Sequence, residues 1–151
     1  MNKWLLVVLA SVFVIGCSPG KQVDFADGSS TQSNHWDGRW LVINYWAEWC
    51  GPCRHEIPEL NQLHEERVSH GLVVLGVNYD GLQGQSLTDV IGRMDIAFPT
   101  LVIDPQKEYG YDRAQVLPMT VIINPERQVH EILSGPQTAQ SILAVTQIQA
   151  Q

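Results

Sequence analysis

Apolar residues are grouped in short runs along the chain, and polar residues, Gly and Pro separate these runs. Residues 41–46 read LVINYW and residues 72–80 read LVVLGVNYD. Nearly continuous apolar runs of this length are typical of strands that are covered on both faces of a sheet. The pattern therefore predicts two buried strands, and we expect shorter extended segments within 23–38 and 98–104.

Helical spacing appears between these runs. From Cys53 onward the apolar residues fall near one face of a helix, which Gly71 is expected to end. These apolar residues are Ile57, Leu60, Leu63 and Val68. Residues 85–95 predict a second helix, and residues 137–150 predict an amphipathic helix that closes the chain.

The last third of the chain predicts a hairpin. Residues 119–133 form two apolar segments around a Pro-Glu-Arg turn, and residues 105–116 predict a turn with a short helix. Strands that alternate with helices and end in a hairpin indicate an α/β fold, with a mixed central β-sheet flanked by helices. We expect the strand–helix–strand crossover to be right-handed and parallel.

The first residues differ from the rest. Lys3 precedes an apolar run from Trp4 to Ile15, which is far shorter than the about 20 residues of a membrane-spanning helix. A charged start, a short apolar middle and small residues at the end are typical of a secretory signal. We therefore predict a cleaved signal peptide over 1–16 and one folded domain over 23–151.

Residues 14–17, VIGC, resemble the lipobox of bacterial lipoproteins. The resemblance implies cleavage before Cys17, lipid on Cys17 and a short tether over 17–22. An ordinary signal peptide, with Cys17 as a bystander, is the alternative. Lipidation would account for the odd number of cysteines, since it leaves Cys50 and Cys53 as a pair.

Composition narrows the class of protein. Sixteen Asp and Glu against nine Lys and Arg give a formal net charge of −7, and no basic run is visible. Nucleic acid is not an expected partner, because phosphate binding needs clustered Lys and Arg. A chain of 151 residues, 44% of them hydrophobic, is long enough to bury one core.

The segment NYWAEWCGPCRHEIP, residues 44–58, carries the candidate chemistry. Cys50 and Cys53 lie where we expect a helix to begin. Unpaired N–H groups and the helix dipole favour a thiolate at that position. Pro52 suits the first turn, since it has no N–H. We assign Cys50 as the attacking nucleophile and Cys53 as the thiol that resolves a mixed disulfide.

Two other interpretations of the cysteine pair remain open. A zinc site usually has a second pair of Cys or His ligands, and the histidines show no such spacing. They are His35, His55, His64, His70 and His130. A structural disulfide suits an oxidising cell envelope. Such a bond would close a very small loop and would constrain the unfolded chain little.

The same segment resembles the active-site segment of the thioredoxin superfamily. More narrowly, residues 23–150 resemble the membrane-anchored thiol–disulfide oxidoreductases of the TlpA/ResA/DsbE type. The matching features are WDGRWLVINYWAEWCGPC, Glu56, Pro58 and YGYDRAQVLPMTVIIN. The resemblance implies a thioredoxin-like fold, thiol–disulfide oxidoreductase activity, and no metal or cofactor besides the dithiol.

Pro118 matches the cis-proline that faces the dithiol in this family, and is a better match than Pro99 or Pro125. The resemblance implies that the backbone of Leu117 is exposed there, so that a substrate chain can pair beside the dithiol. Met119 stands where the family usually has Thr. We expect Met119 to make the substrate groove more apolar.

Asn44 occupies the position of a buried Asp in thioredoxin, and an amide cannot accept the proton that this Asp accepts. In the TlpA-like branch an acid of the active-site helix is thought to substitute. Glu56 lies on the same helical face as Cys53, and we hypothesise that it moves a proton on or off Cys53. The alternative is an ordinary exposed glutamate. Trp49 is the candidate for substrate contact, whereas Trp46 is expected in the core.

The Gly-Pro dipeptide between the cysteines is that of thioredoxin, which is reducing at about −270 mV, whereas DsbA is an oxidant near about −120 mV. We therefore expect a monomeric reductase of protein disulfides, for example in apocytochrome c or another envelope protein. The resemblance implies a DsbD-like membrane electron donor. A copper metallochaperone and a binding module with a static disulfide are the alternatives.

Ser18 follows the predicted anchor cysteine. By resemblance to the lipoproteins of enteric bacteria, Ser at this position favours the outer membrane over the inner membrane. The five residues from Ser18 to Gln22 span at most about 17 Å. A tether of this length would keep an outer-membrane protein away from an inner-membrane donor, which weakens the cytochrome assignment.

Overall fold

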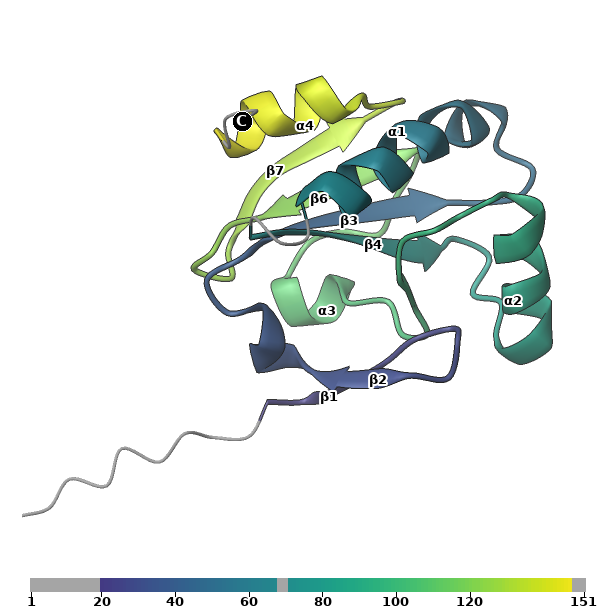
Figure 1. Ribbon diagram of the computed structural model, residues 1–151, viewed down its shortest axis with the longest axis horizontal. Coiled ribbons are helices and arrows are strands. Elements are labelled where there is room, and N and C mark those ends of the chain that lie inside the picture. Colours follow the sequence, from purple (N-terminus) through teal and green to yellow (C-terminus); the bar gives the residue numbers. More distant parts are fainter. Residues whose placement is uncertain (1–19, 68–70, 148–151) are drawn as a thin grey trace, which may run out of the picture.

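The computed structural model describes residues 20–67 and 71–147 (Figure 1). In chain order the elements are β1 Gln22–Asp24, β2 Ser30–Gln32, the 3-10 helix η1 Ser33–Trp36, β3 Trp40–Trp46, α1 Gly51–Arg67, β4 Leu72–Asn78, α2 Gly84–Arg93, β5 Thr100–Leu101, α3 Gln106–Tyr109, β6 Met119–Ile123, β7 Val129–Ser134 and α4 Ala139–Thr146. The predicted signal peptide 1–16 and Cys17 lie outside the described residues. Within the two described ranges, each helix is too short or too polar to cross a membrane.

Five strands form the central sheet, in the order β5-β4-β3-β6-β7. β3 pairs in parallel with β4, and β4 pairs in parallel with β5. β6 is antiparallel to both β3 and β7. The predicted mixed sheet and the predicted hairpin are therefore confirmed. β1 and β2 form a separate two-stranded sheet.

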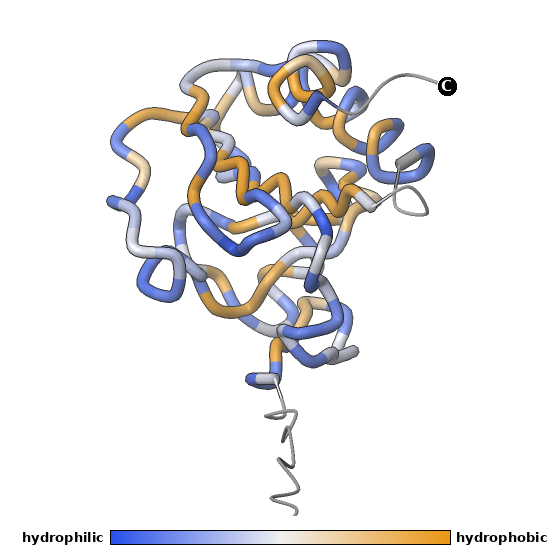
Figure 2. The backbone as a smooth tube through the Cα atoms, turned by 90° about the vertical axis from the view of Figure 1, so that its left-hand side faces the viewer, coloured by the Kyte–Doolittle hydropathy of each residue, from blue (hydrophilic) through white to orange (hydrophobic). Residues whose placement is uncertain are grey.

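The central strands are apolar because both faces of the sheet are covered. Alternate residues of β3 enter two different clusters: Val42 and Trp46 face one, while Ile43 and Tyr45 face the other. α1 and α4 lie on one side of the sheet, and α3 lies with β1 and β2 on the other (Figure 1). Figure 2 shows the apolar strands in the middle of the molecule, with hydrophilic segments around them.

One segment differs from the sequence expectation, whereas the active-site helix occurs where it was predicted. Of the extended segment 98–104, only β5 joins the sheet. Pro99 has no N–H to donate, and the N–H of Val102 bonds to the Asp24 carbonyl at 3.0 Å instead of to β4. α1 begins at Gly51 and continues through Pro58. Pro58 has no N–H to donate and its ring crowds the carbonyl one turn earlier, so it weakens the helix at this point without ending it.

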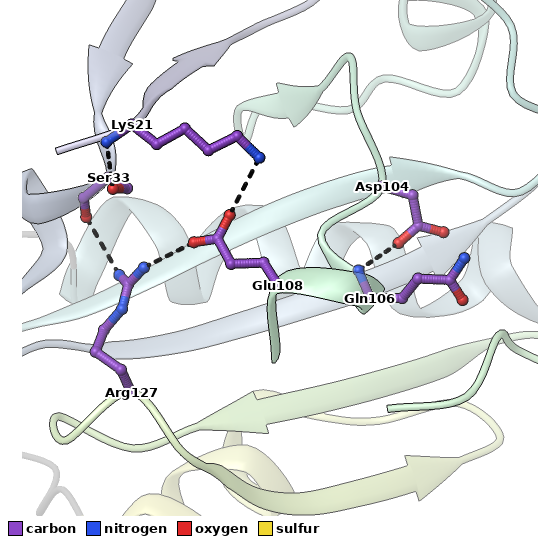
Figure 3. Close-up of polar contacts among 6 residues, drawn as sticks. All are labelled: Lys21, Ser33, Asp104, Gln106, Glu108 and Arg127. Atoms are coloured by element: carbon purple, nitrogen blue, oxygen red, sulfur yellow. Dashed lines mark hydrogen bonds and ion pairs between the residues drawn. The ribbon is translucent and has the colours of Figure 1, made fainter. Parts of the chain in front are cut away.

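Arg127 connects the β6–β7 turn to the elements on the α3 side of the sheet (Figure 3). Its guanidinium donates to the Ser33 carbonyl at 3.2 Å, contacts Glu108 at 3.2 Å, and lies 5.1 Å from the centre of the Tyr109 ring. Lys21 adds a 3.7 Å contact to Glu108 but is mostly exposed, so that pair contributes little. Arg127 thus joins the hairpin turn to η1 and α3.

Candidate active site

Cys50 and Cys53 form a disulfide at the start of α1, and the helix begins where the sequence predicted it. Their Cα atoms are 5.3 Å apart, and the N–H of Cys53 points at Cys50 Sγ at 3.2 Å. Cys53 is fully buried, and Cys50 is 4% exposed in this oxidised state. Once the bond is reduced, the free N–H groups of the helix N-terminus would stabilise negative charge on Cys50 Sγ.

Glu56 lies on the buried face of this helix, with 2% of its surface exposed. Its Oε1 accepts a hydrogen bond from Asn44 Nδ2 at 2.7 Å, and its Oε2 accepts one from the backbone N–H of Gln137 at 2.9 Å. Burial raises the pKa of Glu56 to about 7, although the two hydrogen bonds oppose that rise. The alternative of an exposed helix glutamate is therefore wrong, while the proton-transfer role stays a prediction.

Asn44 connects Glu56 to the sheet. It is fully buried on β3, and its Nδ2 also donates to Thr120 Oγ1 at 3.1 Å. Asn44 and Thr120 are register partners across β3 and β6. Asn44 Oδ1 has no hydrogen-bond partner among the residues that the structure describes. Thr120 was not predicted from the sequence, although a lone polar residue in an apolar strand is an available signal. Gln137 was not predicted either, because it acts through its backbone N–H.

The Leu117–Pro118 peptide bond is cis, and no other cis bond occurs within 20–67 and 71–147. Met119 pairs with Tyr45, so by register Pro118 lies opposite Trp46, where β3 ends and the dithiol loop begins. The Pro118 carbonyl accepts the Gly135 N–H at 2.9 Å, which fixes the end of the hairpin. The cis geometry expected of Pro118 is thus present, and its part in substrate binding stays a prediction.

The predicted substrate-contact residues lie in different surroundings. Trp49 is 66% exposed next to Cys50, whereas Trp46 is fully buried, as predicted. Leu117 is half-buried and packs against both clusters. Met119 is 6% exposed and belongs to the cluster on the sheet face opposite the cysteines. The position of Met119 therefore does not support the prediction that it lines an apolar substrate groove.

The surface around Trp49 is aromatic and charged. Trp49 Nε1 donates to both carboxylate oxygens of Asp80 at 3.1 Å, and its ring meets the Tyr79 ring edge-on at 6.1 Å. The Arg113 guanidinium lies over the Tyr79 ring, 4.6 Å from its centre, and donates to the Tyr79 carbonyl at 3.0 Å. The segment that leads to Pro118 is thus tied to the loop after β4, next to the dithiol.

In the described part of the chain, no group of three or more His, Cys, Asp or Glu side chains is arranged to hold a metal ion. His55 is exposed on α1. The dithiol site itself offers a cysteine at a helix start, a buried second cysteine, and a buried carboxyl whose pKa is raised to about 7.

Comparison with known proteins supports the same chemistry. The sequence profile of the AhpC/TSA family matches residues 18–132. Thiol-disulfide oxidoreductase ResA of Oceanobacillus iheyensis is 28% identical over 112 residues, which are 74% of this chain and 58% of that relative. ResA of Geobacillus kaustophilus is 30% identical over 117 residues, which are 76% of this chain and 66% of that relative. The matched region thus spans less than two thirds of either relative.

A solved structure shares the architecture. The thiol:disulfide interchange protein of the thioredoxin family from Chlorobium tepidum superposes with a TM-score of 0.72 and 22% identity. The superposition covers 87% of this chain and 93% of that chain. The thioredoxin-like α/β fold predicted from the sequence is therefore confirmed.

Proposed function

This chain belongs to the AhpC/TSA family, and on that premise we propose that it is a thiol–disulfide oxidoreductase that reduces protein disulfides through Cys50 and Cys53. The observation that carries the proposal is the position of the pair. Cys50 lies at the N-terminus of α1, and Cys53 is buried one turn in, above a buried glutamate. The similarity to ResA proteins supports the resemblance to the TlpA/ResA/DsbE type.

The reaction consists of two exchanges. The Cys50 thiolate attacks one sulfur of the substrate disulfide and bonds to it, while the other substrate sulfur leaves as a thiolate and takes up a proton. Cys53 then gives its proton to Glu56, and its thiolate attacks Cys50 Sγ. The Cys50–Cys53 bond forms, and the second substrate sulfur leaves and is protonated. The site loses two electrons, and the substrate becomes two thiols.

Each neighbouring residue has a separate task in this proposal. A carboxyl with a pKa of about 7 can accept and return a proton near neutral pH, which supports Glu56 as the base for Cys53. The family resemblance implies that the backbone of Leu117, before Pro118, is exposed, so that an extended substrate segment can pair beside it. Trp49 offers an exposed aromatic surface next to Cys50.

The cellular setting is also part of the proposal. Lipid on Cys17 would hold the domain on a membrane of the cell envelope, facing the periplasm, and Ser18 favours the outer membrane. Electrons would come from a DsbD-like membrane protein. The substrate would be an oxidised envelope protein, with apocytochrome c as one example. The anchor assignments rest on residues 14–18, whereas the donor and the substrate rest on the family resemblance. A short tether at the outer membrane would keep the domain from an inner-membrane donor, which weakens the apocytochrome c example.

Insulin reduction tests the activity. With dithiothreitol as electron source, the protein should accelerate insulin precipitation, and Cys50→Ser should abolish the acceleration. Cys53→Ala should instead accumulate mixed disulfides on Cys50, and mass spectrometry would identify their partners. A wild-type chain that gives no acceleration would overturn the proposal. Tight binding of Cu(I) by the reduced chain would then favour the copper chaperone, and a bond that resists reduction would favour the static binding module.

A further inference from the structure

We propose that Asn44 and Thr120 are positioning residues that keep Glu56 hydrogen-bonded in both its charged and its neutral state, through reversal of the Asn44 side-chain amide. The proposal deepens the proposed function, and it rests on that function only in requiring Glu56 to exchange a proton. Its basis is the set of hydrogen bonds among three side chains that are all at least 98% buried.

The observed orientation fits a charged Glu56. Asn44 Nδ2 carries two N–H donors, and they point at Glu56 Oε1, 2.7 Å away, and at Thr120 Oγ1, 3.1 Å away. A carboxylate has only acceptors, and a threonine hydroxyl can accept. Both donors are therefore satisfied. The reverse orientation would set Asn44 Oδ1 against the carboxylate, oxygen to oxygen, so charge on Glu56 selects the observed one.

A neutral Glu56 needs a different partner. It carries an O–H, which must donate. Both groups that now contact its oxygens are themselves donors, namely Asn44 Nδ2 and the Gln137 N–H. Reversal of the amide would bring Asn44 Oδ1 to the place of Nδ2. That oxygen could then accept from Glu56 and from the Thr120 hydroxyl, which can donate as well as accept.

Reversal of the amide also changes its far end. Asn44 Oδ1 lacks a partner among the described residues, and reversal would place the two N–H donors of Nδ2 there instead. One end of the amide is unpaired in either orientation, and the hydrogen bonds from a neutral Glu56 and from Thr120 must offset the cost of the unpaired donors. Aspartate at position 44 could not do this, because it would oppose a charged Glu56 at hydrogen-bond distance.

Two other groups on α1 that can change charge lie one turn from Glu56. On α1, Glu59 lies one turn beyond Glu56, and its Oε2 accepts the Ala139 N–H at the start of α4 at 3.2 Å. Cys53 lies one turn before Glu56 and becomes ionisable when the disulfide is reduced. The groups contributed by β3 and β6 are Asn44 and Thr120, which do not titrate.

Nuclear magnetic resonance of the oxidised wild-type protein tests the reversal directly. We expect contacts between the Asn44 Nδ2 protons and Thr120 side-chain protons at high pH, and their loss at low pH in step with the Glu56 carboxyl resonance. Contacts that persist while Glu56 titrates would overturn the proposal. A Glu56 carboxyl that keeps one charge state over the whole stable pH range would overturn it too. Neither result depends on disulfide reductase activity.

Two variants separate this role from simple packing. Thr120→Val keeps the shape but removes the hydroxyl, while Thr120→Ser keeps the hydroxyl. In a single-turnover assay, Thr120→Val should slow resolution by Cys53 about fivefold to tenfold, roughly the equivalent of one hydrogen bond, and should leave attack by Cys50 unchanged. Thr120→Ser should restore the wild-type rate and its pH profile. Equal resolution rates in wild type and Thr120→Val would contradict a positioning role.

Discussion

Burial of the Glu56 carboxyl links the stability of the fold to pH. Its pKa lies at about 7 in the folded protein, against an ordinary value of 4.5, because burial outweighs the two hydrogen bonds that favour the charged form. The folded state therefore holds this proton more tightly than the unfolded state. The resulting stabilisation is complete below pH 4.5 and is lost as the pH rises through about 7.

Glu56→Gln should remove this dependence, because the amide has the same shape and no proton to lose. We expect the free energy of unfolding of the wild type, relative to that of Glu56→Gln, to fall by about 3 kcal/mol from acid to neutral pH. Urea unfolding with the disulfide intact measures both. Glu65→Gln, exposed on the same helix, is the control and should track the wild type. A constant difference between wild type and Glu56→Gln would contradict the linkage.

The cysteines could be located from the sequence because a helix start is a local property, and Glu56 could be located from the family resemblance together with its helical spacing from Cys53. Sequence reasoning missed Thr120 and Gln137, since their contacts with Asn44 and Glu56 join segments that are distant in the chain. Met119 was assigned to the dithiol side, but its side chain lies on the opposite face. Side chains alternate along a strand, so an error of one residue in register exchanges the two faces.

At the scale of elements, Gly76 shows why a central strand carries a glycine. A Cβ added to Gly76 would lie 2.8 Å from Thr100 Oγ1, 2.9 Å from Trp46 Nε1 and 3.0 Å from Phe98 Cε2. Trp46 and Phe98 belong to the cluster between the sheet and its helices. The missing side chain on β4 thus leaves the space that the indole and phenyl rings fill.

Gly76→Ala should therefore overpack the core and lower the free energy of unfolding by about 2 kcal/mol. Chemical denaturation measures the change. Gly92→Ala is a matched control in α2, where an added Cβ meets nothing within 4 Å, and helix propensity predicts a gain of about 0.5–1 kcal/mol. Equal denaturation midpoints for Gly76→Ala and the wild type would show that β4 has room for a methyl group.

Hydrophobic periodicity predicted the long elements and lost accuracy on the short ones. β3, β4, α1, α2 and the β6–β7 hairpin occur where the pattern placed them. β5 is only two residues long, because the next backbone N–H bonds to β1 rather than to β4. Tertiary contacts decide which strand accepts such a hydrogen bond, and these contacts cannot be predicted from a local sequence pattern.

For the whole molecule, the class of fold was predictable but the strand order was not. Alternating strands and helices predicted a mixed α/β sheet, which is confirmed. The order β5-β4-β3-β6-β7 depends on pairings between distant segments, such as β3 with β6. In Figure 1 the described chain begins at β1, far from the start of α1, where the dithiol lies. A lipid at Cys17 would therefore hold the domain by the end remote from its cysteines.

Replacement of the anchor residue tests this arrangement. Cys17→Ser should remove the acyl group and move the protein from the detergent phase to the aqueous phase in Triton X-114 partition of cells that express it. The reason is that lipid chains, rather than a spanning helix, would supply the membrane affinity. Metabolic labelling with a fatty-acid analogue should fail for the same variant. Cys50→Ser should label and partition like the wild type. Unchanged partition of Cys17→Ser would refute lipid anchoring.

The end of β1 and the residues after it, Asp24 to Ala26, also affect the tendency of the protein to aggregate. One edge of β5 pairs with β4. Two backbone hydrogen bonds cover its other edge: the Ala26 N–H donates to the Thr100 carbonyl, and the Val102 N–H donates to the Asp24 carbonyl. A recombinant chain that began after Ala26 would lose this cover. The bared sheet edge could then template pairing with another copy, so such a trimmed protein would aggregate where the longer one stays dispersed.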